Sequence, residues 1–168
     1  MQFIRYHCSI VNLLFMKKKR IALVAHDNCK KDLIEWVSFN RKVLLKHNLV
    51  CTGTTGRLVE QALIHDDIIG SGELNIRILK SGPLGGDQQL GSLIADGKID
   101  IFIFFWDPMQ AQPHDVDVKA LLRICVLYNV PTAMNRATAD FIISSGLFEQ
   151  EYTPIISDYT NYLHRIIP

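Results

Sequence analysis

Apolar and polar positions along this chain predict strands and helices in regular alternation. Short runs of apolar or alternating residues, typical of buried strands, lie at residues 21–25, 49–51, 75–79, 99–105 and 130–133. Between these runs, apolar residues recur every three or four positions, as on the buried face of a helix, over residues 30–46, 58–62, 88–95, 116–128 and 138–145. This alternation predicts an α/β fold, a single doubly wound domain with a mostly parallel central sheet flanked by helices.

Polar residues follow four of the predicted strands within two positions. They are His26, Thr52, Ser81 and Asp107. In a doubly wound sheet the ligand binds beyond the carboxyl ends of the strands, which meet at one edge. We therefore expect these four side chains to converge on one site.

Length and composition fit one folded domain. The 168 residues are 48% hydrophobic and 21% charged, which allows a single substantial core. Met16 precedes a basic run. We therefore predict a domain over residues 17–168 and, over residues 1–16, an N-terminal extension that is disordered or results from a misassigned start. Residues 64–73 contain several aspartates and glycines and predict a surface insertion.

Net charge and cysteine spacing argue against several classes of function. A formal net charge of +1 disfavours a nucleic-acid partner, which would require a basic surface. The apolar segment 8–16 is interrupted by Asn12 and is too short to span a membrane, and its lysines follow it, unlike those of an export signal. The four cysteines are too far apart for a Cys-x-x-Cys motif, so we expect reduced thiols and a cytoplasmic location.

The segment 52–56, Thr-Gly-Thr-Thr-Gly, is a candidate anion site. Its three hydroxyls and its glycine amides form a turn just before a predicted helix, where free N–H groups and the helix dipole favour a phosphate. Lys30, four residues after His26, could add a positive charge. A plain helix cap and a solvated lysine are the alternative interpretations of these residues.

A carboxylate and a histidine are candidates for proton transfer. Asp87 follows three glycines, where the backbone can approach a ligand and a helix could begin, so we expect its carboxylate at the rim of a site rather than in a core. Removal of a proton beside a carbonyl group requires a donor that stabilises the enolate oxygen, and His114 fits that role. Asp107 or Asp117 could fix the tautomer of His114, and a loop-capping role for either carboxylate is the open alternative.

Six segments in the same order resemble the methylglyoxal synthase family, in a match that runs from about residue 19 to the C-terminus. They are residues 22–30, 52–56, 81–89, 104–108, 113–123 and 135–140. The resemblance implies a carbon–oxygen lyase that converts dihydroxyacetone phosphate (glycerone phosphate) to methylglyoxal and inorganic phosphate through an enediolate intermediate, in a bypass of glycolysis. It makes residues 17–168 the catalytic domain and implies no metal or other cofactor.

The resemblance also implies roles for individual residues. The implied catalytic residues are Asp87, His114, Asp117 and Asp107, with Asp87 as the base and His114 stabilising or protonating the enediolate oxygen. The implied substrate-binding residues are His26, Lys30, Thr52, Gly53, Thr54, Thr55, Ser81, Gly82 and His114. The implied partners are the substrate, inorganic phosphate as product and inhibitor, and further copies of the chain in an allosteric homohexamer, with no nucleic acid and no membrane.

Two other functions are compatible with parts of this pattern. A similar fold serves as the regulatory domain of carbamoyl phosphate synthetase, a non-catalytic module whose phosphate pocket senses nucleotides and needs no acid–base pair. A metal-dependent phosphoesterase is the second, since imidazole and carboxylate suit several divalent metals. Its ligands would come from residues that lack the fixed spacing of a strong metal motif, namely His26, Asp27, Asp87, His114, Asp115 and Asp117.

Overall fold

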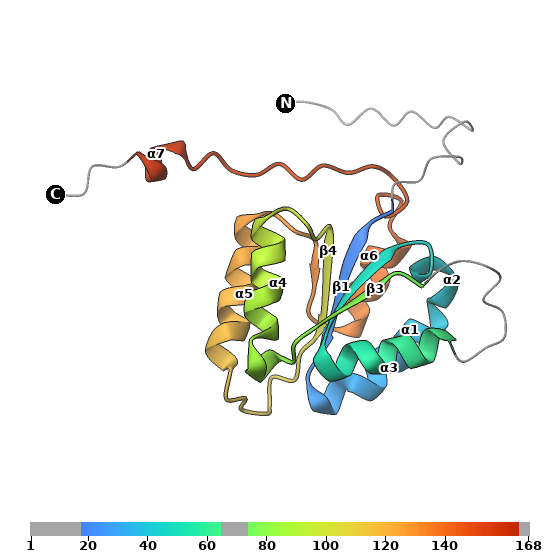
Figure 1. Cartoon of the computed structure of the whole chain (residues 1–168). Coiled ribbons are helices and arrows are strands. Elements are labelled where there is room, and N and C mark those ends of the chain that lie inside the picture. The colour runs from blue at the N-terminus through green and yellow to red at the C-terminus, as the bar shows by residue number, and fades with distance from the viewer. Residues whose placement is uncertain (1–17, 65–73, 165–168) are drawn as a thin grey trace.

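The computed structural model describes residues 18–64 and 74–164 of the chain. The predicted extension over residues 1–16 lies outside the described residues, as does the predicted insertion except for Ile64. Figure 1 shows a layered arrangement, with one sheet between two groups of helices.

The described strands form one five-stranded sheet in the order β3-β2-β1-β4-β5. Every neighbouring pair is parallel, and the register places Ile21 between Leu49 and Ile101. The chain builds outward from β1 to β3 and then returns to the other side of β1, so the topological switch point lies between β1 and β4. The predicted strands are confirmed as β1 (Arg20–Ala25), β2 (Asn48–Thr52), β3 (Ile76–Leu79), β4 (Ile101–Phe105) and β5 (Thr132–Ala133).

Helices cover both faces of the sheet, with α4 and α5 on one face and α1, α3 and α6 on the other (Figure 1). The predicted doubly wound domain is thus confirmed. None of the described helices is both long and apolar enough to span a bilayer. The helices are α1 (Lys30–Phe39), α2 (Arg41–Leu44), α3 (Gly53–Ile64), α4 (Gly86–Ala95), α5 (Asp115–Leu127), α6 (Arg136–Ser144) and α7 (Thr160–Leu163), with short 3-10 turns η2 (Asp27–Cys29) and η3 (Gly82–Leu84).

Two hydrophobic cores lie on opposite faces of the sheet, and successive side chains of each central strand pack alternately into one and the other. Ile21 and Leu23 of β1 pack with α1 and α3, whereas Ala22 and Val24 pack with α4 and α5. All residues of β4 are buried, because helices cover both of its sides. This double coverage explains why the sequence of β4 is apolar throughout and does not alternate.

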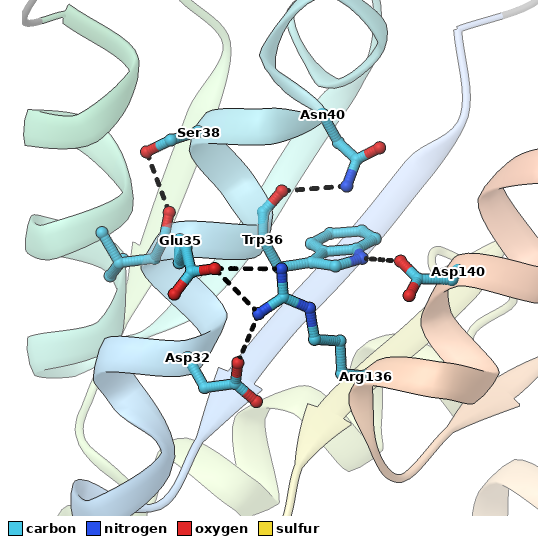
Figure 2. Close-up of polar contacts among 8 residues, drawn as sticks. Asp32, Glu35, Trp36, Ser38, Asn40, Arg136 and Asp140 are labelled. Atoms are coloured by element: carbon cyan, nitrogen blue, oxygen red, sulfur yellow. Dashed lines mark hydrogen bonds and ion pairs between the residues drawn. The ribbon is translucent and has the colours of Figure 1, made fainter.

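Helix α6 is fastened to α1 by a buried anchor and an exposed ion-pair cluster (Figure 2). The Nε1 of Trp36, a buried residue, donates to Oδ1 of Asp140 at 2.7 Å. The guanidinium of Arg136 donates to Asp32 at 2.7 Å and to Glu35 at 3.2 Å. Exposed pairs of this kind contribute at most about 1 kcal/mol, so burial of the indole is the larger stabilising contact.

The single helix predicted over residues 30–46 is wrong, because the helix is interrupted at Asn40. That residue has φ −92° and ψ 12°, and its Nδ2 donates to the carbonyl oxygen of Trp36 at 2.9 Å. An asparagine side chain that binds the backbone in this way competes with helical hydrogen bonds. The chain turns here from α1 into the short α2 and then into β2.

Candidate active site

A pocket of about 200 Å³ lies beyond the carboxyl ends of β1 and β2 and beside the loop that follows β3. Most of the residues expected in the site line it. Gly53, Asp107 and Asp117 are not among its lining residues. Those that line it are His26, Lys30, Thr52, Thr54, Thr55, Ser81, Gly82, Asp87 and His114.

The turn predicted over residues 52–56 is wrong, because β2 runs directly into α3 at Gly53. Gly53 has φ +21°, and a Cβ there would lie 2.7 Å from the Cα of Ser81. Only glycine allows this close approach of the two site segments. Its N–H donates to the carbonyl oxygen of Lys80 at 3.1 Å, and the following N–H groups of the first turn lack partners within the helix. The start of α3 therefore offers an anion site at the pocket.

Three side chains add polar groups to this anion site. Thr52 is buried and Thr54 is exposed, and both line the pocket. The Nζ of Lys30 also lies at the pocket, where it contacts Oδ1 of Asp27 at 2.5 Å. This hydrogen bond lowers the pKa of Asp27 and holds the ammonium group close to the pocket.

Asp87 lines the pocket, as expected, but its side chain is buried. The prediction that its carboxylate lies at the rim of the site is therefore wrong. The residue stands in the first turn of α4, which begins at Gly86. Its Oδ2 has no hydrogen-bond partner among the described residues. Burial raises the pKa of its carboxyl group, and the nearby imidazole of His114 partly opposes this rise. Burial removes a carboxylate from water and thereby makes it a stronger base than an exposed one.

His114 occupies the N-cap position of α5, where its side chain makes no capping hydrogen bond and faces Asp87. Its Nε2 lies 3.6 Å from Oδ2 of Asp87, while its Nδ1 has no hydrogen-bond partner among the described residues. Neither Asp107 nor Asp117 therefore fixes this ring by a hydrogen bond, contrary to the expectation from the sequence. Asp117 acts on Asp87 through its charge, which adds to the rise in the pKa of Asp87.

His26 presents one ring nitrogen to the protein and the other to the pocket. Its Nδ1 accepts from the backbone N–H of Asp107 at 3.3 Å, and its buried Nε2 has no partner among the described residues. Burial lowers the pKa of this imidazole, which favours the neutral form. The ring packs edge-on against Phe104 with centroids 4.9 Å apart. A neutral ring that accepts at Nδ1 carries its proton on Nε2, so His26 offers a donor to a bound molecule.

Sequence reasoning missed several residues of the site. Gln112, Pro83 and Phe104 line the pocket. Gln112 immediately precedes the Pro-His-Asp segment that was singled out, and its place in that loop was the available signal. Asn28, between the expected His26 and Lys30, binds the carboxylate of Asp107 at 2.7 Å.

Two further observations concern the alternatives. Within residues 18–64 and 74–164, no group of three or more His, Cys, Asp or Glu side chains is arranged to hold a metal ion. A larger cavity of about 420 Å³ lies at the amino ends of β1 and β4. Two carboxylates line it, Glu151 and Asp100, and Asp100 binds the guanidinium of Arg20 at 2.6 Å. No histidine is among its lining residues, so it lacks the paired carboxylate and imidazole of the first pocket.

Comparisons with known proteins agree with this geometry. A family model described as MGS-like domain matches residues 32–134. Methylglyoxal synthase of Maridesulfovibrio salexigens is 57% identical over 89% of this chain and 98% of that protein. Methylglyoxal synthase of Yersinia enterocolitica is 53% identical over 88% of this chain and 91% of that protein. The crystal structure of methylglyoxal synthase from Elizabethkingia anophelis superposes with a TM-score of 0.80 at 56% identity, over 90% of this chain and 93% of that one. The chain belongs to the methylglyoxal synthase family.

Proposed function

We propose that this chain is a carbon–oxygen lyase that converts dihydroxyacetone phosphate to methylglyoxal and inorganic phosphate. The observation that carries the proposal is the 3.6 Å approach of His114 Nε2 to Oδ2 of Asp87 in a pocket beside the start of α3. Relatives more than 50% identical over most of the chain are named methylglyoxal synthase, which supports the same activity here.

The two ends of the substrate suit the two halves of the pocket. The phosphate binds the free N–H groups at the start of α3, with the hydroxyls of Thr52 and Thr54 and the ammonium group of Lys30. With the phosphate bound there, the carbonyl and hydroxymethyl groups of the substrate point toward Asp87 and His114. The N–H on Nε2 of His26 is a further donor to a substrate oxygen.

The reaction begins with removal of a proton by Asp87 from the hydroxymethyl carbon. The electron pair of that C–H bond forms the enediolate, and an N–H donor at Nε2 of His114 stabilises or protonates its oxygen. The hydroxyl proton of the same carbon is then lost as the phosphate oxygen separates from the third carbon, which is bonded to the other side of the former carbonyl carbon. Phosphate leaves with the electron pair, and the enol of methylglyoxal gains a proton at its terminal carbon.

Elimination sets a geometric demand on the anion site. The breaking carbon–oxygen bond must stand roughly perpendicular to the enediolate plane, because only then do its electrons overlap with the π system. The start of α3 must therefore hold the phosphate out of that plane. An isomerase that uses the same intermediate must hold the phosphate in the plane instead.

An assay of the purified protein with dihydroxyacetone phosphate tests the proposal. We expect methylglyoxal and phosphate to appear in equal amounts, also after exhaustive chelation. Phosphate release without the dicarbonyl, lost on chelation, would instead indicate the metal-dependent phosphoesterase. Binding of a nucleotide or of phosphate without turnover would indicate the non-catalytic sensing module, which needs no buried acid–base pair.

Family membership supports three further proposals about the working state of the enzyme. Phosphate binds as an inhibitor as well as a product, because the same anion site accepts it. The chain assembles as an allosteric homohexamer. It acts in the cytoplasm, as a bypass of glycolysis. Phosphate titration of the initial rate and the mass in solution test the first two proposals.

A further inference from the structure

Asn28 links the turn after β1 to the loop after β4. It lies in η2, two residues after His26. Its Nδ2 donates to Oδ2 of Asp107 at 2.7 Å and to Oε1 of Gln110 at 3.0 Å. Both acceptors belong to the loop that follows β4, so one amide group fixes that loop against the site segment.

Asp107 is held in place on both sides of its carboxylate. Oδ2 accepts from Asn28, and Oδ1 accepts from the backbone N–H of Met109 at 2.9 Å. The carboxylate is therefore occupied by the protein, and Asp107 is not among the residues that line the pocket. The hydrogen bond from Asn28 is the largest cause of the lowered pKa of this carboxyl group.

The backbone of Asp107 is the part that reaches the site. Its N–H donates to Nδ1 of His26 at 3.3 Å. The opposite tautomer would place a proton on Nδ1 of His26. Two donors, this N–H and the backbone N–H of Asp107, would then face each other. The position of this backbone N–H therefore decides whether Nε2 of His26 carries the proton that faces the pocket.

We propose that Asn28 is a positioning residue for the reaction, which holds the Asp107 loop so that the backbone N–H of Asp107 keeps His26 as a donor at Nε2. The inference rests on the proposed function for its consequence in catalysis. The proposal also changes the role expected for Asp107. Its carboxylate accepts a hydrogen bond from Asn28, and its backbone N–H donates one to His26. Neither residue touches substrate in this account.

Kinetics of three variants provide the first test. Asn28→Ala and Asp107→Ala should each raise the KM for dihydroxyacetone phosphate about tenfold, with kcat within about twofold, since His26 is a binding donor. The double variant should be no worse than either single variant, because all three lose the same link. A merely destabilised protein would lose kcat with its active fraction and keep its KM. Asp96→Asn, in an exposed ion pair with Lys98, is the control.

Exchange of the two side chains should restore the link. Asn28→Asp alone places two carboxylates next to each other, and this variant should have the highest KM for dihydroxyacetone phosphate of the set. The double variant Asn28→Asp with Asp107→Asn reverses donor and acceptor, and its KM should return to within about threefold of the wild-type value. A swap that recovers the melting temperature without recovering KM would overturn the proposal.

Nitrogen NMR of His26 tests the inference without substrate. In the wild type, Nδ1 should give the shift of an unprotonated acceptor and Nε2 that of a protonated nitrogen, whereas Asn28→Ala should average the two. An unchanged tautomer, or single-variant effects that add in the double variant, would overturn the role of Asn28. Wild-type protein that makes no methylglyoxal would refute the proposed function, while the NMR result would still decide the tautomer.

Discussion

A methyl group on Gly82 would lie 2.8 Å from Nε2 of His114, closer than real Cβ atoms approach a neighbour. The same atom would lie 3.0 Å from Oδ2 of Asp87. Gly82 is not among the described glycines with positive φ, so space and not backbone conformation requires glycine here. The glycine therefore sets how closely the acid–base pair and a bound substrate can meet.

Substitution Gly82→Ala should lower kcat about 100-fold, because a displacement near 1 Å of a catalytic group has an effect of that size. The melting temperature should change little, since the three atoms nearest the methyl group would all belong to the ends of two side chains and none to the backbone. Gly146→Ala is a matched control, because a Cβ there meets nothing within 4 Å. Equal kcat values for the two variants would show that the pair tolerates displacement.

Substitution His114→Gln should lower kcat about 100-fold and change KM much less, because the imidazole acts on the enediolate and not on the phosphate. Steady-state kinetics of the two proteins provide the measurement. A wild-type turnover number in the variant would remove His114 from the mechanism.

Substitution Lys30→Met should raise the KM for substrate and the inhibition constant for phosphate together, each about tenfold, since one ammonium group serves both anions. The neighbouring Lys31 is exposed and does not line the pocket, so Lys31→Met should leave both constants unchanged. A rise in KM alone would place the phosphate elsewhere.

Much of the site was predictable because parallel strands bring their carboxyl ends together. His26, Thr52 and Ser81 line one pocket, as expected from their positions after β1, β2 and β3. The link between Asp107 and His26 was not predictable, since it depends on a backbone N–H, which every residue except proline carries. The residue type therefore gave no signal for it.

Stability should depend on the charge of Asp87. Its pKa is raised in the folded protein, so the folded state favours the neutral carboxyl group, and this contribution is lost as the pH rises through the raised pKa. Asp87→Asn removes the titration. The free energy of unfolding of the variant, minus that of the wild type, should therefore increase as the pH rises above about 4, the ordinary pKa of an aspartate. Urea unfolding at one protein concentration provides the measurement. A constant difference would contradict the raised pKa.

The depth of Asp87 was the least predictable feature of the site. Three nearby glycines indicated close approach of a ligand, but not that α4 would begin at Gly86 and carry the carboxylate inward. Likewise, the sequence of Thr52 and Gly53 suited a turn as well as a helix start. The structure starts the helix at Gly53, where the backbone lies so close to Ser81 that a Cβ would not fit.

The central claim, that Asp87 is the base, is tested most directly with substrate deuterated at the hydroxymethyl carbon. For the wild type we expect a primary isotope effect on kcat/KM. Asp87→Asn should lose at least about 1,000-fold in kcat while its KM stays within about threefold, and Asp87→Glu should keep part of the activity. An Asp87→Asn variant whose kcat stays within about tenfold of the wild-type value would contradict the account.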